Sequence, residues 1–98
     1  MAFQIRFEDE AVAHLDKFKA RERSTVLGEI EGQLAKQPDV RTRHRQPLRS
    51  KPLTKWQLSI GDFRVFYDIE ESQNEVVILA IGTKAGKRLI IGRKEYRL

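Results

Sequence analysis

The sequence predicts a single α+β domain over residues 1–98, in which an N-terminal strand and a helical hairpin precede a mainly antiparallel sheet of three to four strands. Three observations support this prediction. Residues 56–60 alternate apolar and polar side chains, which is the period of a strand with one buried face. In residues 63–69 the same period places Phe63, Val65, Tyr67 and Ile69 on one face and Arg64, Phe66 and Asp68 on the other. Only Gly61 and Asp62 separate these runs, so a tight hairpin must join them. Residues 76–81 are apolar on both faces, as in a central strand covered on both sides.

The first quarter of the chain is predicted to form a strand and a helix. Phe3, Ile5 and Phe7 alternate with polar residues, which indicates the strand. The acidic residues 8–10 then favour a helix start, because negative charge stabilises the N-terminal end of the helix dipole. The expected buried stripe of this helix consists of Ala11, Leu15 and Phe18.

A second helix is expected to begin with Ser24 as its cap and to end before Pro38. Its predicted core face consists of Leu27, Ile30 and Leu34. The opposite side carries Gly28, Gly32 and Ala35. Each glycine costs about 1 kcal/mol relative to alanine inside a helix. These small residues therefore indicate either close approach by a partner helix or an imperfection that tertiary packing tolerates. Beyond this helix, we expect a loop over residues 37–55 and a short last strand at 89–91.

The composition excludes several classes of protein. The chain has no cysteine, so disulfides and thiolate zinc sites are excluded, and a reducing cytoplasm is the expected location. No apolar run approaches the roughly 20 residues that a membrane-spanning helix needs. The sequence contains neither a phosphate-binding glycine loop nor a Gly-x-Ser-x-Gly motif. We therefore expect a protein without cofactor, metal or membrane partner.

Basic charge is concentrated in two segments of the chain. Residues 41–55 carry six cations and no acid, and residues 84–98 carry six cations and one acid, whereas the remainder is net acidic. Such segregation favours a surface for a polyanion, although a solvated loop would also explain the first segment. The candidate nucleic-acid-binding residues are Arg43, Arg45, Arg49, Lys51, Lys55, Lys87 and Arg88.

Arg64 is the central candidate for chemistry, because the strand pattern places it in mid-sheet and facing away from the main core. Lys84 follows the next strand along the chain. A sheet face with fixed cations can bind an RNA phosphate and stabilise the extra charge that develops when a 2′-hydroxyl attacks it. The competing interpretation of Arg64 is a structural ion pair with Asp62 or Asp68.

Two stretches of the sequence resemble a known family. Residues 60–67 read Ile-Gly-Asp-Phe-Arg-Val-Phe-Tyr, and residues 79–84 read Leu-Ala-Ile-Gly-Thr-Lys. With the order of elements, these stretches resemble the RelE/ParE superfamily of bacterial toxins over nearly the whole chain. The resemblance implies the toxin of a type II toxin–antitoxin module, held inactive by a cognate antitoxin. Toxins of the RelE branch enter the ribosomal A site and cut mRNA, whereas the ParE branch poisons DNA gyrase.

The resemblance assigns roles to individual residues. Arg64 falls on the mid-strand arginine of the family, and Lys84 falls where the RelE branch usually has an arginine. Two lysines of the ribonuclease branch would align with Gln57 and Ser59, and its tyrosine is represented only by the more distant Tyr96. We therefore predict a ribosome-dependent, metal-independent mRNA endonuclease (an mRNA interferase) that inhibits translation, with Arg64 and Lys84 as catalytic residues. The alternatives are a non-enzymatic inhibitor of DNA gyrase and a catalytically weak binding module with the toxin fold.

Overall fold

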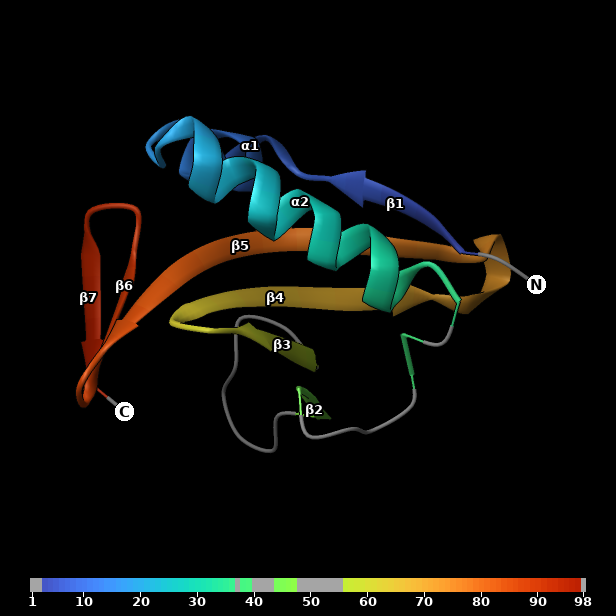
Figure 1. The fold of residues 1–98 in the computed structure, drawn as a ribbon. Coiled ribbons are helices and arrows are strands. Elements are labelled where there is room, and N and C mark those ends of the chain that lie inside the picture. Colours follow the sequence, from blue (N-terminus) through green and yellow to red (C-terminus); the bar gives the residue numbers. More distant parts are fainter. Residues whose placement is uncertain (1–2, 37, 40–43, 48–55, 98) are drawn as a thin grey trace.

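The computed structural model describes residues 3–36, 38–39, 44–47 and 56–97. In this part of the chain, one seven-stranded sheet carries two helices on one face (Figure 1). The elements in order are β1 (Gln4–Phe7), α1 (Asp9–Asp16), α2 (Ala20–Leu34), β2 (Arg45–Pro47), β3 (Trp56–Ile60), β4 (Phe63–Glu70), a 3-10 turn (Glu71–Gln73), β5 (Glu75–Ala85), β6 (Arg88–Ile91) and β7 (Lys94–Arg97). The predicted α+β architecture is confirmed. The sheet is larger than expected, because β2 forms inside the expected loop and β7 follows the expected last strand.

The sheet is antiparallel from β2 to β7 in sequence order, and β1 joins it parallel to β5. One edge of β5 pairs with β4 along nearly its whole length. The other edge is shared, because β1 pairs with residues 75–78 and β6 with residues 82–85. Residues 79–81 therefore lie between two strands that do not reach them. The long β5 curves as it runs past the end of β4 toward the β6–β7 hairpin (Figure 1).

A β-bulge sets which side chains of β5 face the helices. Phe66 pairs with Ala80, but the next residue, Tyr67, pairs with Ile78, so Leu79 is an extra residue on β5. An inserted residue shifts the alternation of the bulged strand by one position. Ile78 and Ile81 consequently both pack in the main core, although three positions separate them. The doubly apolar run at 76–81 is thus explained by a bulged central strand.

The main core lies between the helices and the sheet, and Tyr67 of β4 is its largest fully buried side chain. The Tyr67 hydroxyl donates a 2.7 Å hydrogen bond to the carbonyl of Pro38. Burial raises the pKa of Tyr67, which keeps this hydroxyl protonated as a donor. The other fully buried or nearly buried members of the core are Ala11, Leu15, Val26, Ile30, Leu34, Leu58, Ile60, Val65, Val76, Ile78 and Ile81.

Helix α2 differs from the prediction in its start and in one core residue. It begins at Ala20, where the Lys19 N–H donates a 3.0 Å hydrogen bond to the Glu22 carboxylate, so the Ser24 cap was wrong. Leu27 is 40% exposed, and Val26 takes the core position beside Ile30 and Leu34. Two adjacent apolar residues fit a helical stripe equally well, and only packing against the sheet decides between them.

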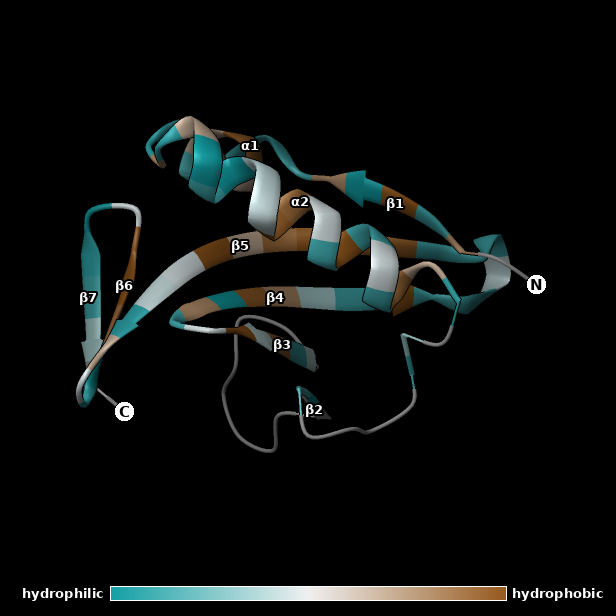
Figure 2. Ribbon diagram, in the orientation of Figure 1, coloured by the Kyte–Doolittle hydropathy of each residue, from teal (hydrophilic) through white to brown (hydrophobic). Residues whose placement is uncertain are grey.

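A second, smaller apolar cluster covers part of the sheet face opposite the helices. It consists of Phe66, Ala80, Leu89 and Ile91, with the half-buried Tyr96 packed against it. Phe66 therefore faces away from the main core, as predicted. The apolar residues of β6 contrast with the polar residues of β7 (Figure 2). In the described ranges, neither helix is long and apolar enough to cross a membrane.

Candidate functional site

The two predicted catalytic residues lie on the same face of the sheet, the one opposite the helices, which we call the outer face. The strand register places Arg64 opposite Gly82, and Lys84 lies two residues further along β5. Residues two apart on a strand share a face, so the Arg64 and Lys84 side chains are diagonal neighbours. Lys84 pairs with Leu89, and Leu89 pairs with Tyr96. Tyr96 therefore lies on this face too, in the same cross-strand row as Lys84.

The guanidinium of Arg64 is anchored by backbone atoms. Its Nη1 donates hydrogen bonds of 2.7 Å to the carbonyl of Gly61 and 2.9 Å to that of Phe63. Neither Asp62 nor Asp68 forms an ion pair with Arg64, so the competing prediction of a structural ion pair was wrong. Within the described part of the chain, the hydrogen bonds of Arg64 engage Nη1 alone. The Nε–H and the two Nη2–H groups remain, and they form the edge that binds two oxygens of a phosphate.

The β3–β4 turn also fixes the backbone at Lys84. The Lys84 N–H donates a 2.7 Å hydrogen bond to the carbonyl of Asp62, next to the Gly61 carbonyl that binds Arg64. The Lys84 side chain itself is exposed. One two-residue turn thus positions both cations, Arg64 through its side chain and Lys84 through its backbone.

Strand β3 brings no charge to the outer face. Ser59 pairs with Arg64, and Gln57 pairs with Phe66. Both side chains are half-buried and share the face of their partners. Gln57 and Ser59, where the family resemblance predicted lysines, are therefore close to Arg64 in space, but their side chains offer only neutral hydrogen-bonding groups.

The three predicted nucleic-acid-binding residues that the structure describes are not all on one surface. Arg45 pairs with Leu58 and so faces the helices, where its Nη1 donates a 3.1 Å hydrogen bond to the Gln33 carbonyl. Arg45 is thus on the opposite face of the sheet from Arg64, and its role in nucleic-acid binding stays a prediction. Lys87 and Arg88 are exposed near the β5–β6 turn, and Arg88 forms a 3.2 Å ion pair with Glu95. The other predicted members, Arg43, Arg49, Lys51 and Lys55, lie outside the described residues.

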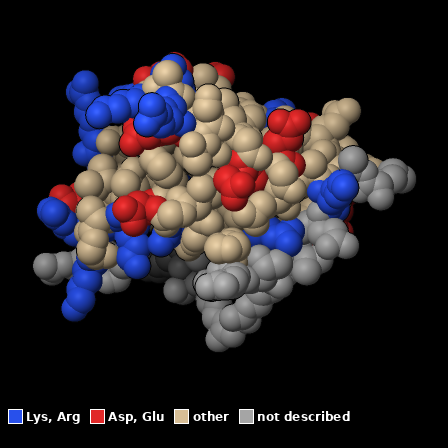
Figure 3. All heavy atoms as spheres, in the orientation of Figure 1, with Lys and Arg blue, Asp and Glu red and all other residues tan. Residues whose placement is uncertain are grey.

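A group of cations that the sequence analysis did not single out lies where the helices meet the β6–β7 hairpin. Lys17, Lys19 and Arg21 are exposed around the α1–α2 connection, and Arg93 and Lys94 are exposed at the β6–β7 turn. The two segments meet because His14 contacts Gly92. We call these five residues the basic corner, and Lys and Arg side chains gather on this side of the molecule, at the left of Figure 3. The alternating cations of residues 17–23 are the feature of the sequence from which this group could have been predicted.

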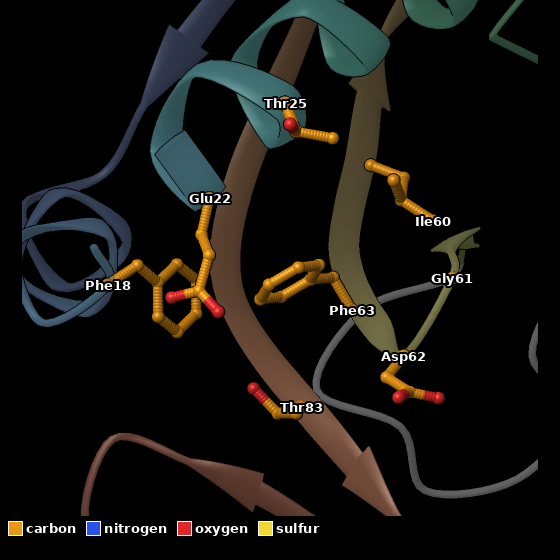
Figure 4. Close-up of a pocket in the computed structure, with 8 residues that line it drawn as sticks. All are labelled: Phe18, Glu22, Thr25, Ile60, Gly61, Asp62, Phe63 and Thr83. Carbon is orange, nitrogen blue, oxygen red and sulfur yellow. The ribbon is translucent and has the colours of Figure 1, made fainter. Parts of the chain in front are cut away.

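A hollow of about 390 Å³ lies on the helix side of the same strands. Its walls include Phe18 and Phe63, whose ring centroids are 5.1 Å apart, and Glu22 of α2 also lines it (Figure 4). Thr83 also lines the hollow, whereas its neighbours Gly82 and Lys84 face the other way. The hollow and the cations of the outer face are therefore on opposite sides of β5.

Comparison with known proteins agrees with this architecture. Residues 5–87 match the family model described as the ParE toxin of the type II toxin–antitoxin system parDE. The chain belongs to this toxin family. A solved chain from the RelBE2 toxin–antitoxin complex of Mycobacterium tuberculosis superposes with a TM-score of 0.75 at 26% identity, covering 86% of this ParE-family chain and 100% of the solved one. No curated protein matches the chain. The predicted membership of the RelE/ParE superfamily is confirmed.

Proposed function

We propose that this toxin cleaves mRNA on the ribosome and thereby inhibits translation, with the outer face as its active site. The observation that supports the proposal is the anchored guanidinium of Arg64, which keeps three N–H donors available beside Lys84. A cation held by backbone carbonyls needs little reorganisation when charge develops on a substrate, which is the condition for strong electrostatic catalysis. No metal is required by this scheme.

The chemistry follows from the arrangement of these groups. Attack of a ribose 2′-oxygen on the adjacent phosphorus forms a 2′,3′-cyclic phosphate and breaks the bond to the 5′-oxygen, which receives a proton. The fork of Arg64 stabilises the non-bridging oxygens, and Lys84 stabilises the leaving oxygen as a mobile point charge. We assign to Tyr96, in the row of Lys84, the role of taking the 2′ proton in its phenolate form, and to the ammonium group of Lys84 the proton that the 5′-oxygen receives.

A second candidate function is non-enzymatic inhibition of DNA gyrase. The neutral Gln57 and Ser59 favour it, because β3 supplies no cation beside Arg64. The family model that matches the chain also carries the name of the ParE toxin. In this case the outer face would be a protein-binding surface, and Arg64 would contribute to affinity and not to rate.

Both candidates include a cognate antitoxin as partner, since the matched Mycobacterium chain comes from a toxin–antitoxin complex. Induced expression of this chain alone should therefore arrest growth, and co-expression with the adjacent small gene should restore it. Colony counts after induction measure the effect, with western blotting to show equal toxin levels. Normal growth in cells that contain soluble, folded protein would contradict the assignment as a toxin.

The basic corner should strengthen RNA binding through phosphate contacts. Each phosphate contact on a single strand steepens the dependence of log K on log salt by about 0.7, because counterions are released. Reversing Lys17, Lys19 and Arg21 to Glu should therefore flatten the slope by about two, measured by fluorescence anisotropy on a labelled RNA. Lys36→Glu is a matched control for Lys19→Glu, since Lys36 is an exposed cation beyond the far end of α2. Equal effects of these two single reversals would show that only net charge matters.

A further inference from the structure

His14 closes the gap that β1 and β6 leave on the edge of β5. Pairing with β1 ends at Ile78, and pairing with β6 begins at Gly82. Between them, the backbone N–H of Ile81 donates a 3.2 Å hydrogen bond to Nδ1 of His14. Ile81 is fully buried, and a buried N–H without an acceptor is costly. A side chain of α1 thus replaces the missing strand.

The same imidazole supports the β6–β7 hairpin. A Cβ on Gly92 would lie 3.2 Å from Cδ2 and 3.3 Å from Nε2 of His14, so the backbone of the β6–β7 turn lies directly against the ring. Gly92 has φ +62°, a conformation that other residues rarely adopt. All four residues of β6 pair with β5, and Gly92 directly follows the last of them, so this contact extends the attachment into the β6–β7 turn.

The hydrogen bond requires a neutral imidazole, because Nδ1 must be an acceptor and the ring proton is then on Nε2. Burial lowers the pKa of His14 below its usual range, Glu10 on the same helix opposes this shift, and Lys17 adds to it. From the hairpin, Arg93 follows the Gly92 that contacts the ring. Residues 79–81 of β5 carry no titratable side chain.

We propose that His14 is a positioning residue for the outer face: its neutral ring holds the β6–β7 hairpin on β5 and so places Tyr96 beside Lys84 and Arg64. The part of this inference that concerns Tyr96 rests on the proposed function. Protonation adds a hydrogen at Nδ1, which then faces the N–H of Ile81 and can no longer accept its hydrogen bond. The hydrogen bond to Ile81 and the contact with Gly92 therefore weaken together. Since the folded-state pKa lies below the unfolded value of about 6.5, the contribution is complete above that pH and is lost as the pH falls through the folded-state pKa.

Two variants separate the hydrogen bond from the titration. His14→Asn places Oδ1 near the position of Nδ1 and keeps an acceptor that does not titrate, whereas His14→Leu keeps apolar bulk without an acceptor. In the wild type, protection of the Ile81 and Ile90 amides from hydrogen exchange, corrected for intrinsic rates, should fall by up to about tenfold for each pH unit between the unfolded value of about 6.5 and the folded-state pKa, and it should level off below that pKa. His14→Asn should keep its protection down to pH 5, and His14→Leu should lose protection at every pH.

The exchange data test the role of His14 independently of any toxin activity. A pH profile of His14→Asn identical to that of the wild type, or full Ile81 protection in His14→Leu, would overturn the proposal. If His14→Leu does not fold, the pH profiles of Ile81 protection in His14→Asn and in the wild type still test the proposal. As the pH falls, cleavage by the wild type should decline together with the protection of the Ile81 amide. In His14→Asn, cleavage should no longer follow this decline. A wild type that shows the exchange profile but cuts no RNA supports the hairpin contact and contradicts the ribonuclease.

Discussion

Replacing Arg64 by alanine should lower mRNA cleavage on translating ribosomes by about 10²–10³-fold, the typical effect of removing one donor that stabilises transition-state charge. Arg64→Lys should recover only part of this loss, because lysine keeps the charge but cannot hold two carbonyls and a phosphate at once. Lys84→Ala should have an effect similar to that of Arg64→Ala. Primer extension on a translated message measures the cleavage, and Arg6→Ala, which removes an exposed arginine from ion pairs with Glu8 and Glu75, is the matched control.

The same variants discriminate between the candidate functions. If the toxin acts on gyrase, the wild type should give no ribosome-dependent cleavage, and its induction should produce DNA breaks and an SOS response. A lower melting temperature in Arg64→Ala would instead assign the carbonyl contacts of Arg64 a structural role.

Tyr96→Phe should reduce cleavage without weakening ribosome binding, and cleavage unchanged by this substitution would exclude Tyr96 as the base.

Gly82→Ala should destabilise the fold by about 1–3 kcal/mol, which is the usual cost of overpacking. A Cβ on Gly82 would lie 2.7 Å from the carbonyl oxygen of Ile90 and 2.7 Å from Cγ1 of Ile91, so β6 would have to move away from β5. Gly82 also pairs with Arg64, and the displacement would therefore reach the outer face. Urea unfolding followed by circular dichroism measures the change.

Gly28→Ala is the matched control for Gly82→Ala, and the expected effect has the opposite sign. Gly28 is inside α2, and a Cβ there would meet nothing within 4 Å. Alanine should therefore stabilise the fold by about 0.5–1 kcal/mol, since it lowers the entropy of the unfolded chain. Destabilisation by both substitutions would show that Gly28 makes a contact, as the partner-helix interpretation requires.

The features that sequence alone could predict are those with a local period or a short connection. The alternation of residues 63–69 correctly placed Val65 and Tyr67 in the core and Arg64 and Phe66 on the other face. The two-residue spacing at 61–62 correctly predicted the β3–β4 hairpin. Placing Lys84 beside Arg64 required in addition the register of β5, which the bulge at Leu79 changes partway along the strand.

The remaining features depend on contacts between distant segments. Arg45 faces the helices because of its pairing with Leu58, and no property of the surrounding basic run indicates that register. His14 is one of two histidines in the sequence and belongs to no motif, and its role depends on Ile81 and Gly92, both more than sixty residues away. Val26 and Leu27 are equally apolar, so only the shape of the sheet beneath them selects the buried one.

The shared edge of β5 has a consequence for the order in which the protein folds. Strand β1, near the start of the chain, pairs in parallel with β5, near its end, through partners such as Gln4 and Glu75. Such long-range pairing closes a large loop and slows folding. During synthesis, β1 and both helices are made long before the strand that covers them. The toxin therefore acquires its outer face only after β5 and the β6–β7 hairpin have been translated.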